Sequence, residues 1–571
     1  MFTVDVSLVT YNSSADIPGF IDSLFAQDIG PERICLYVVD NASTDETIEF
    51  IRECIEKQEG KLSKVVIEKS PVNLGFGRGH NRAVFQGTSE FVFVVNPDIV
   101  LPADCLSILL STAQSSDSSV AVWEPRQVPF EHPKLYNPVS LETNWVSGAA
   151  FLCRRSVYEQ VGGFDPRIFL YEEDVDLSWR IRASGYRLMY VPKAFVRHFS
   201  YLDPEQGKPT QAVYSALGNM YIRARFGKPK NILFGLYNYL SLILKGDKRL
   251  YDRKLMIRNL YLYLKNFAHF RLGGWHKKAK FRFYRWGYSP IRKGAGMKIV
   301  PSSDLPSHPK VSVLIRTMGR KNLLRRALIS VANQTYPNIE TVIVQDCQDT
   351  LSDFLKEFEQ LDIKFLPLGK NMGRSIAGNE AMRLAQGEYF VFLDEDDEFY
   401  ADHIEQLVCR ALNSGVKVAY SVAFEAPTKI DTEKDTIIGE GDYVIAFDNK
   451  FSYTAMCHHN ILPILTVLFH RSLFESYGGF DPDFDLNEDW DLWLRYSFLH
   501  GRFSYVPKTT CLYRVPLDTN MTQQRLAALE ESVDRVIEKN KDLTIQLTCG
   551  QLHDDFESLF PNKKDWKRPR R

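Results

Sequence analysis

Four consecutive acidic residues in the C-terminal half are the first candidates for chemistry. Asp394-Glu395-Asp396-Asp397 directly follows an apolar strand expected at 389–393, and residues two apart at a strand end point to the same side. Carboxylates placed in this way can hold a divalent cation whose other ligands are phosphate oxygens and water. Asn96-Pro97-Asp98 follows the matching apolar run, 91–95, in the N-terminal half. We therefore expect metal ligands at Asp98, Asp394 and Asp396. The alternative is a solvated acidic turn.

Two further acidic segments each offer a general base. Glu172-Glu173-Asp174 and Asn487-Glu488-Asp489 each follow a Gly-Gly-Phe-Asp-Pro segment and open an apparent helix, at 175–184 and 490–499. A positioned carboxylate can take the proton of an attacking hydroxyl. Acidic residues at a helix N-terminus also act as ordinary capping residues. The same spacing in both halves favours catalysis, so we predict Asp174 and Asp489 as the bases.

Charged residues follow the predicted bases on the same helices. Arg180 and Arg495 lie six residues after them. These arginines could face a diphosphate or pair with acids on their own helix, and the spacing does not decide between the two. Asp176 and Asp491 are expected to be structural or acceptor-orienting.

Polar residues also end the first two strands expected in each half. Asp40 and Asp346 close the second strand, where a carboxylate can accept a hydrogen bond from a nucleobase N–H or a ribose hydroxyl. A turn aspartate is the alternative. Thr10-Tyr11-Asn12 and Arg316-Thr317 end the first strand. Gly75 begins a glycine-rich stretch before a helix, which alone is a weak indication of phosphate contact.

One histidine could complete the N-terminal metal site. His198 follows a Val-Pro-Lys segment and could supply the ligand that Asn96 does not. A buried or surface histidine without a metal is the alternative. The C-terminal half has Tyr513 at the same distance from its own Val-Pro-Lys segment, so the two metal sites are not expected to be identical.

These segments belong to an internal repeat. Seven blocks recur in the same order in the two halves, including the Gly-Gly-Phe-Asp-Pro, Glu-Asp and Tyr-Val-Pro-Lys segments. Val38-Val39-Asp40 is matched with Val344-Gln345-Asp346, and Asn73-Leu74-Gly75 with Asn371-Met372-Gly373. We infer two copies of one domain, at 1–204 and 305–530.

Each copy is expected to have an α/β fold. Short β-branched runs such as 4–10, 34–39 and 91–95 alternate with segments of helical periodicity such as 17–27 and 43–59. This order predicts a Rossmann-like, mostly parallel sheet, and ligands bind at the carboxyl ends of strands in such sheets.

Composition narrows the class of protein. The 571 residues have a formal net charge of −1, 44% hydrophobic and 25% charged residues, a globular profile too long for one ordinary domain. The nine cysteines contain no CxxC pair and are expected to be reduced, as in a cytosolic protein. No secretory signal and no membrane-spanning segment are expected.

At these residues the chain resembles the inverting glycosyltransferases of family 2, which have the GT-A fold. The resemblance covers both copies. It implies that the DxD-like aspartates hold Mg²⁺ or Mn²⁺ and that the Glu-Asp aspartate is the base. It also implies nucleotide-sugar contacts at Thr10, Asn12, Asp40, Asn73, Gly75, Asn81, Arg180, Arg316, Thr317, Asp346, Asn371, Gly373, Asn379 and Arg495. The N-terminal copy is most similar to bacterial rhamnosyltransferases, which implies dTDP-L-rhamnose or another NDP-hexose as its donor.

A basic segment, 205–304, is expected to join the copies as helices. Between Glu205 and Lys298 there are 21 Lys or Arg and three acids, interspersed with Tyr, Phe, Leu and Trp. The segment could be a packed linker with a solvated basic face, or could dock on an anionic membrane surface. Nucleic-acid binding is disfavoured because no known module is recognisable. Residues 531–571 are expected to form a helix and a basic tail.

These features lead to one main hypothesis and two alternatives. The main hypothesis is a bifunctional, metal-dependent hexosyltransferase that builds a lipid-linked surface glycan of the O-antigen type. We expect it to be cytoplasmic and peripheral on the inner face of the bacterial membrane. The alternatives are a protein with one catalytic head and one binding scaffold, and a nucleotidyltransferase.

Overall fold

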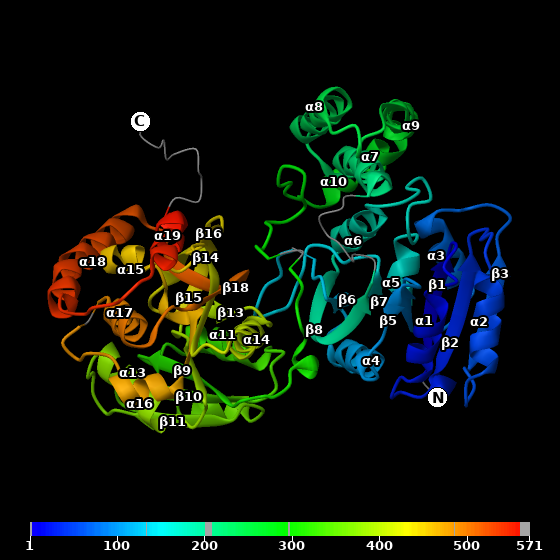
Figure 1. Cartoon of the computed structure of the whole chain (residues 1–571). Helices are drawn as coiled ribbons and strands as arrows, with labels where there is room; N and C mark the ends of the chain where they lie inside the picture. The colour runs from blue at the N-terminus through cyan, green and yellow to red at the C-terminus, as the bar shows by residue number, and fades with distance from the viewer. Residues whose placement is uncertain (1–2, 133, 200–207, 295–296, 485, 560–571) are drawn as a thin grey trace. The chain divides into compact units, whose positions relative to one another are not determined.

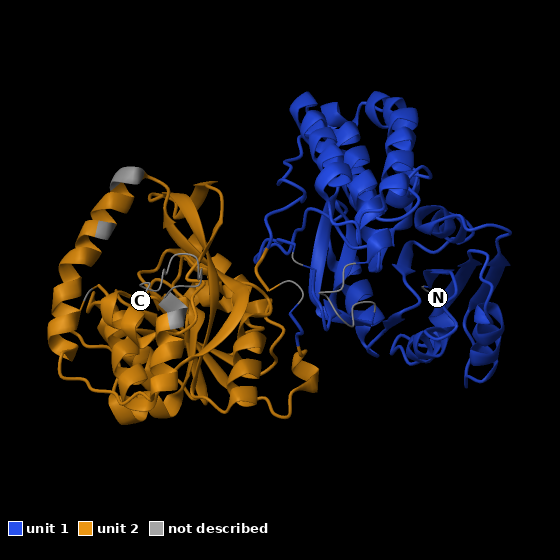
Figure 2. Ribbon diagram, turned by 45° about the horizontal axis from the view of Figure 1, so that its top comes forward, with its two compact units in different colours: residues 1–291, 295–299 blue, residues 292–294, 300–571 orange. Residues whose placement is uncertain are grey.

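The computed structural model describes residues 3–132, 134–199, 208–294, 297–484 and 486–559. The basic end of the chain, 560–571, and the segment 200–207 lie outside the described residues. The chain forms two compact units, Met1–Ile291 with Ala295–Ile299 and Arg292–Gly294 with Val300–Arg571 (Figure 2). Each unit contains one of the repeated domains.

The first unit is built on an eight-stranded sheet of order β3-β2-β1-β4-β7-β6-β8-β5 (Figure 1). β1 pairs in parallel with both β2 and β4, whereas β7 is antiparallel to β4 and β6. The sheet is therefore mixed, with a parallel half that begins the unit. Its strands are β1 (Val4–Thr10), β2 (Ile34–Asp40), β3 (Lys64–Lys69), β4 (Phe91–Val95), β5 (Ile99–Val100), β6 (Val120–Val128), β7 (Ala150–Arg154) and β8 (Arg187–His198).

Helices cover both faces of this sheet, which explains why its central strand β4 is apolar throughout. Phe91, Phe93 and Val95 of β4 pack in a cluster with residues of α1, α2 and α4. Val92 and Val94 point to the opposite face and pack with residues of α3, α5 and α6. These helices are α1 (Ile17–Phe25), α2 (Thr47–Glu56), α3 (Phe76–Val84), α4 (Cys105–Ser115), α5 (Arg155–Gln160) and α6 (Glu173–Ala183).

The basic middle segment folds as helices within the first unit. α7 (Pro209–Phe226), α8 (Pro229–Lys245) and α9 (Arg253–Leu272) form a bundle, and the short α10 (Trp275–Lys278) follows (Figure 1). Met220, Tyr221, Tyr239, Tyr263 and Phe270 lie in the core of the bundle. α7 and α10 both contact α6, so this bundle adjoins the helix that carries Asp174.

The second unit repeats this architecture around the order β11-β10-β9-β12-β17-β14-β18-β13, with β15 and β16 added to β14. The strands are β9 (Val311–Thr317), β10 (Ile339–Gln345), β11 (Ile363–Pro367), β12 (Tyr389–Phe392), β13 (Glu398–Phe399), β14 (Val418–Asp431), β15 (Thr436–Glu440), β16 (Val444–Ala446), β17 (Val467–His470) and β18 (Ser504–Pro516). The helices are α11 (Lys321–Ala332), α12 (Ser352–Leu355), α13 (Arg374–Leu384), α14 (His403–Ser414), α15 (Tyr453–His458), α16 (Arg471–Tyr477), α17 (Glu488–His500), α18 (Thr519–Asn540) and α19 (Cys549–Leu559).

The predicted α/β class is confirmed in both units, but several predicted boundaries were wrong. α2 begins at Thr47 instead of residue 43, because the Ser43 side chain bonds to Asp40. α6 and α17 begin at Glu173 and Glu488, two residues earlier than expected. Among the described residues, no helix has the length and apolar character needed to span a bilayer.

Candidate active sites

The candidate site of the first unit is a pocket of about 320 Å³ at the carboxyl ends of the parallel strands. Asn96 follows β4, His198 ends β8, and the start of α6 supplies the segment 172–175. α7 adds Gln211 and Ser215 to the wall. The pocket thus brings together two predicted site residues, Asp174 and His198, that are distant in the sequence.

Asp174 is half-buried in the wall of this pocket and is held by two backbone amides. Its Oδ2 accepts from the Gly148 amide at 2.9 Å and its Oδ1 from the Val175 amide at 2.8 Å. Burial raises the pKa of Asp174, and the two amide donors and the charge of Lys134 act in the opposite direction. The carboxylate is therefore fixed in orientation and is more basic than an exposed aspartate.

The residue that introduces the helix has an unusual backbone. Glu172 has φ 72° and Asn487, at the same place in the second unit, has φ 59°. Residues other than glycine rarely adopt this left-handed conformation, and it often occurs at functional sites. Burial raises the pKa of Glu172 to about 8. The sharp turn lets the next two acids, Glu173 and Asp174, lie in the first helical turn.

Asp98 and His198 lie together at the edge of the same site. Asp98 precedes β5, which pairs antiparallel with β8 so that Ile99 lies opposite His198. His198 Nε2 lies 3.3 Å from Asp98 Oδ2. His198 Nδ1 contacts Gln127 Oε1 at 2.9 Å, which orients the ring as in many metal-ligating histidines. This donor pair fits a divalent cation that keeps further ligands from phosphate and water. Within the described residues, no cluster of three or more His, Cys, Asp or Glu forms a complete metal site.

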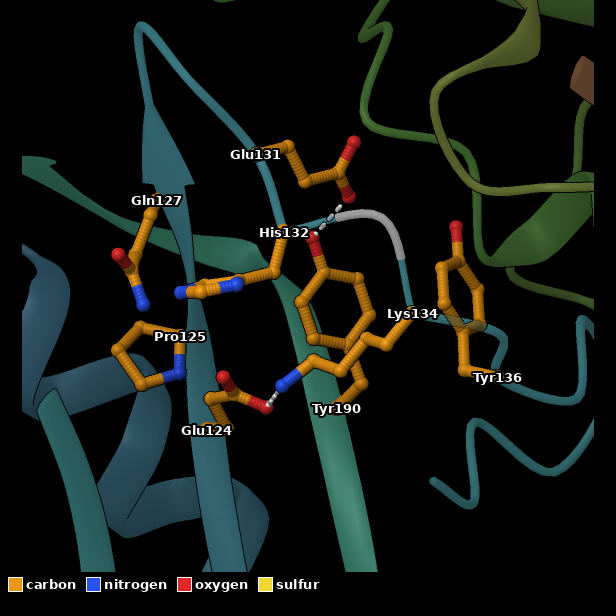
Figure 3. A pocket seen from close by; sticks show the side chains of 8 residues that line it. All are labelled: Glu124, Pro125, Gln127, Glu131, His132, Lys134, Tyr136 and Tyr190. Carbon is orange, nitrogen blue, oxygen red and sulfur yellow. Dashed lines mark hydrogen bonds and ion pairs between the residues drawn. The ribbon is translucent and has the colours of Figure 1, made fainter. Parts of the chain in front are cut away.

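A buried ion pair beside Asp174 was not predicted. Lys134 Nζ contacts Glu124 Oε2, and both side chains are almost fully buried (Figure 3). Glu124 Oε1 accepts from the Ser147 amide at 2.9 Å, and the next amide, of Gly148, donates to Asp174. A cavity of about 10 Å³, room for about one water, lies against this pair (Figure 3). Nothing in the local sequence pattern indicates this ion pair, because the contact joins a strand to a loop.

The second unit has a pocket of about 370 Å³ around its acidic loop. Arg316 donates to Asp394 through Nε and Nη2 and to Glu488 through Nη1, at 2.8–3.1 Å. Arg320 Nη2 donates to Asp396 at 2.9 Å and its Nε to Glu395 at 2.7 Å. The predicted ligands Asp394 and Asp396 are therefore together, but each is paired with an arginine. A cation here would have to share the carboxylates with the guanidinium groups or displace them.

Asp489 is the counterpart of Asp174 in this unit. Its Oδ1 accepts from the Trp490 amide at 2.9 Å. Burial, followed by the charge of Glu488, raises the pKa of Asp489 to about 7. Asp489 does not line the pocket that holds Arg316 and Asp394.

In the comparison of the two repeats, Asp40 was matched with Asp346, and this match was wrong by one residue. The structural counterpart of Asp40 is Gln345. Thr10 pairs with Asp40 in the parallel sheet, whereas Thr317 pairs with Gln345. Asp40 accepts from Thr10 Oγ1 at 3.0 Å and from the Ser43 amide at 3.0 Å. The strand register therefore places Gln345 where the first unit has a buried carboxylate.

The counterpart of Asp346 is Asn41, and both residues hold the following loop. The Asp346 carboxylate accepts from the amides of Met372 and Gly373, at 2.6 and 2.9 Å. Asn41 Nδ2 donates to the Gly75 carbonyl at 3.1 Å. Gly75 has φ 82°, and an added Cβ would lie 2.4 Å from the Phe169 carbonyl oxygen. The glycine is thus required by both conformation and space.

Other predicted contact residues bond within short loops. Asn73 and Asn371 each accept, through Oδ1, from the amide of the glycine two residues later, at 2.9 and 3.1 Å. Asn12 has φ 51°, and its Oδ1 accepts from the Thr44 amide at 2.9 Å. Their contact with a nucleotide sugar stays a prediction.

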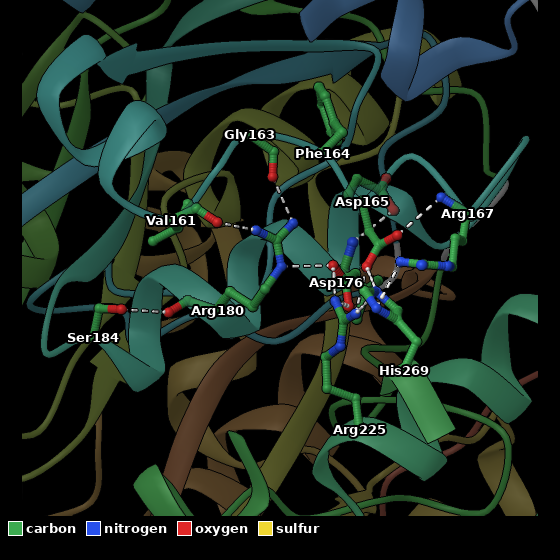
Figure 4. A network of polar contacts seen from close by, with 12 residues as sticks. Val161, Gly163, Phe164, Asp165, Arg167, Asp176, Arg180, Ser184, Arg225 and His269 are labelled. Carbon is green, nitrogen blue, oxygen red and sulfur yellow. Dashed lines mark hydrogen bonds and ion pairs between the residues drawn. The ribbon is translucent and has the colours of Figure 1, made fainter. Parts of the chain in front are cut away.

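Four predicted contact residues hold the Gly-Gly-Phe-Asp loops, and their contact with a nucleotide sugar stays a prediction. The amide of Asn81 bonds to both backbone groups of Phe164 at 2.8 Å, and that of Asn379 bonds likewise to Phe480. Arg180 pairs with Asp176 and donates to the carbonyls of Val161 and Gly163 (Figure 4). Arg495 makes the matching contacts with Asp491, Tyr477 and Gly479. Of the two roles left open for the arginines, the structure shows the ion pair on their own helix.

Comparison with known proteins agrees with this geometry. The family model described as "Glycosyl transferase family 2" matches residues 5–177 and 312–465, together more than half of the chain. One curated relative is an N-acetylglucosaminyl-diphospho-decaprenol L-rhamnosyltransferase of Mycobacterium tuberculosis, 28% identical over 241 residues, with 34% of this chain and 75% of the relative covered. A putative teichuronic acid biosynthesis glycosyltransferase of Bacillus subtilis is 27% identical, with 37% and 81% covered.

Solved structures also match. A mannosyltransferase from Pyrobaculum calidifontis, in complex with GDP-Man and Mn²⁺, is 21% identical and has a TM-score of 0.33. The match covers 48% of this chain and 79% of that one.

Proposed function

Since this chain belongs to glycosyltransferase family 2, we propose that it is a bifunctional inverting glycosyltransferase with one active site in each unit. The observation that carries the proposal is the recurrence of a Glu-Asp pair in the first turn of α6 and of α17, with the glutamate buried and the aspartate half-buried in both. Each pair follows a residue with a left-handed backbone conformation, so the same local turn orients both aspartates.

In the proposed reaction, a hydroxyl oxygen of the acceptor attacks C1 of the donor sugar from the side opposite the nucleoside diphosphate. Asp174 or Asp489 takes the hydroxyl proton, and the bond from C1 to the diphosphate oxygen breaks. Burial raises the pKa of both aspartates, which strengthens them as bases. A divalent cation, Mg²⁺ or Mn²⁺, would offset the charge that develops on the diphosphate. Asp98 and His198 would hold it in the first unit, and Asp394 and Asp396 in the second.

The donor and acceptor are proposed from the relatives. The name of the mycobacterial relative describes transfer of L-rhamnose to a lipid-diphosphate-linked N-acetylglucosamine. We propose that the first unit uses dTDP-L-rhamnose, that the acceptor is a lipid-linked glycan, and that the product is a bacterial surface polysaccharide of the O-antigen type. With such an acceptor, we propose that the enzyme acts at the inner face of the cytoplasmic membrane.

One specific observation favours a second candidate, in which only the first unit is catalytic. Arg316 and Arg320 neutralise Asp394 and Asp396, so a metal–diphosphate complex must compete with two guanidinium groups. In this candidate the second unit binds a nucleotide or sugar without transferring it.

Transfer assays with a panel of nucleotide sugars test the proposal. We expect Asp174→Asn to lower transfer from one donor by at least about 100-fold, and Asp489→Asn to do so for the other donor or linkage. Asp117→Asn and Asp353→Asn, at exposed carboxylates of the first and second unit, are the controls. Full activity of both catalytic variants with every donor would refute the assignment of the bases. Loss of activity only in Asp174→Asn would establish the one-head candidate.

Metal removal tests the cation. EDTA should abolish transfer, and Mn²⁺ or Mg²⁺ should restore it. Undiminished transfer at both sites in EDTA would exclude the proposed roles of Asp98, His198, Asp394 and Asp396.

A further inference from the structure

In the first unit, the helices α8 and α9 each have two apolar faces. One face packs against the rest of the unit, and the other is exposed. On the inner side, Tyr239 of α8 and Met256, Tyr263 and Phe270 of α9 are buried against α7. The outer side is not polar, as it would be on an ordinary surface helix. It carries large apolar side chains at intervals of three, four and eight residues. These are Leu233, Tyr237, Leu240 and Leu244 on α8, and Ile257, Tyr261, Leu264 and Leu272 on α9, which are 41–80% exposed.

Cations surround these apolar stripes. Lys245, Lys248, Arg249, Arg253 and Lys254 are exposed where α8 ends and α9 begins. Arg258 and Lys265 are exposed on the outer side of α9 beside Ile257 and Leu264. The acids of this stretch are Asp247 and Asp252, and their side chains accept from the amides of Arg249 and Leu255. The outer surface is therefore both apolar and strongly positive.

This combination points to one kind of partner. We propose that the outer face of the α8–α9 pair docks on the surface of an anionic lipid bilayer. An apolar stripe enters the boundary between headgroups and acyl chains, and the flanking lysines and arginines pair with anionic headgroups. A second protein molecule would fit the apolar stripe but not so dense a positive rim. Helices of 17 and 20 residues, about 26 and 30 Å long, lie along the surface.

The docking face is linked to the candidate site through α7. α8 and α9 pack on α7, and Gln211 and Ser215 of α7 line the pocket that contains Asp174. This link rests on the proposed function, because only a lipid-linked acceptor needs the pocket near the bilayer. The docking itself does not rest on it and is measured separately.

Vesicle flotation tests the docking. The full chain is mixed with vesicles of phosphatidylcholine alone, or of phosphatidylcholine with 30% phosphatidylglycerol, in low and in high salt. We expect binding to the anionic vesicles that falls with salt. The variant Tyr237→Ser/Leu244→Ser/Leu264→Ser should lower the bound fraction by about tenfold or more, since three exposed apolar side chains that would enter the bilayer are lost. Ile438→Ser/Leu499→Ser, at exposed apolar residues of the second unit, should bind as the wild type does.

The outcomes separate docking from catalysis. Absence of vesicle binding, equal binding to neutral and anionic vesicles, or unchanged binding of the triple variant would each overturn the proposal. The proposal would also fail if the triple variant changed from dimer to monomer and its vesicle binding did not change. The outer face of α8 and α9 would then be a contact between copies of the chain. Transfer to a detergent-dispersed acceptor should be the same in the triple variant and the wild type. Inactivity of both would refute the proposed function and leave the docking result standing.

Discussion

Asp489 provides the clearest test at the scale of single residues. Burial and the neighbouring charge of Glu488 raise the pKa of Asp489 to about 7. A general base must be ionised to act, so second-site transfer should rise with pH. Between pH 6 and pH 8 the ionised fraction of such a group increases about tenfold. We expect kcat/KM at this site to follow that rise, measured in the Asp174→Asn variant. A flat profile over this range would show that Asp489 is not the base.

Lys134 should affect the first site without touching the substrate. Its charge opposes the rise in the pKa of Asp174, so Lys134→Met should move the rise of first-site activity to higher pH. The change also leaves Glu124 buried without its cation, which should lower the free energy of unfolding by about 3–5 kcal/mol. The double variant Glu124→Gln/Lys134→Met should regain much of the stability. Its pH profile should shift less than that of Lys134→Met, because it also removes the negative charge of Glu124 that couples to Asp174. An unshifted profile in Lys134→Met would mean that the pair is only structural.

The candidate catalytic and metal-binding residues could be predicted where residue type and local spacing were enough to identify them. The Glu-Asp pairs and the DxD-like aspartates lie at strand and helix ends, which periodicity locates to within a few residues. Arg180 could not be assigned in this way, since its partners include the carbonyls of Val161 and Gly163. The exchange of Asp40 for Gln345 depends on the parallel register, which a repeated block shifted by one residue does not reveal.

At the scale of elements, the repeated helix that carries the base is tied to a helix outside the α/β domain. In the first unit, Arg225 of α7 contacts both Asp176 of α6 and Asp165 of the Gly-Gly-Phe-Asp loop, and His269 of α9 also contacts Asp165 (Figure 4). In the second unit, Lys539 of α18 contacts the corresponding aspartates, Asp481 and Asp491. The same two acids thus receive a cation from a different helical extension in each unit.

Arg225→Met should destabilise the first unit. Its guanidinium is 3% exposed and Asp176 is fully buried. The change leaves Asp176 with Arg180 and Asp165 with His269 as the remaining partners. We expect a loss of about 3 kcal/mol, the lower end of the range for a broken buried pair, in the free energy of opening around α6. Hydrogen exchange of peptides from α6, compared with peptides from α17, measures this loss locally.

Lys539→Met is the matched variant for the second unit. Arg495 still pairs with Asp491, as Arg180 does with Asp176 in the first unit. The Lys539 ammonium is 31% exposed, against 3% for Arg225, so we expect a smaller loss, about 1–2 kcal/mol, around α17. Equal protection of α6 in wild type and Arg225→Met would show that the ion pairs do not hold this helix.

At the scale of the whole molecule, the two units share a fold but differ at their sites. The first has Asp98 with His198, and the second has Asp394 and Asp396 with two arginines. The first has a buried carboxylate, Asp40, at the end of β2, and the second has Gln345. The duplication was evident from the sequence because seven short blocks recur in the same order in both halves. The differences depend on side-chain partners that only the folded units bring together. They are the basis for our proposal that the two units differ in donor or acceptor.

Two different sites on one chain should be separable and complementary. If each unit adds one sugar to the same lipid-linked glycan, neither Asp174→Asn nor Asp489→Asn alone should form the product that carries both sugars. A mixture of the two variants on shared vesicles should form it, because each chain supplies one intact site and the intermediate can pass between chains. The product is identified by mass spectrometry, and the double variant is the control that should form neither linkage.

Full product from either single variant alone would mean that the substituted unit is not catalytic. Failure of the mixture, with each variant still forming its own single linkage, would mean that the intermediate is not released between the two transfers.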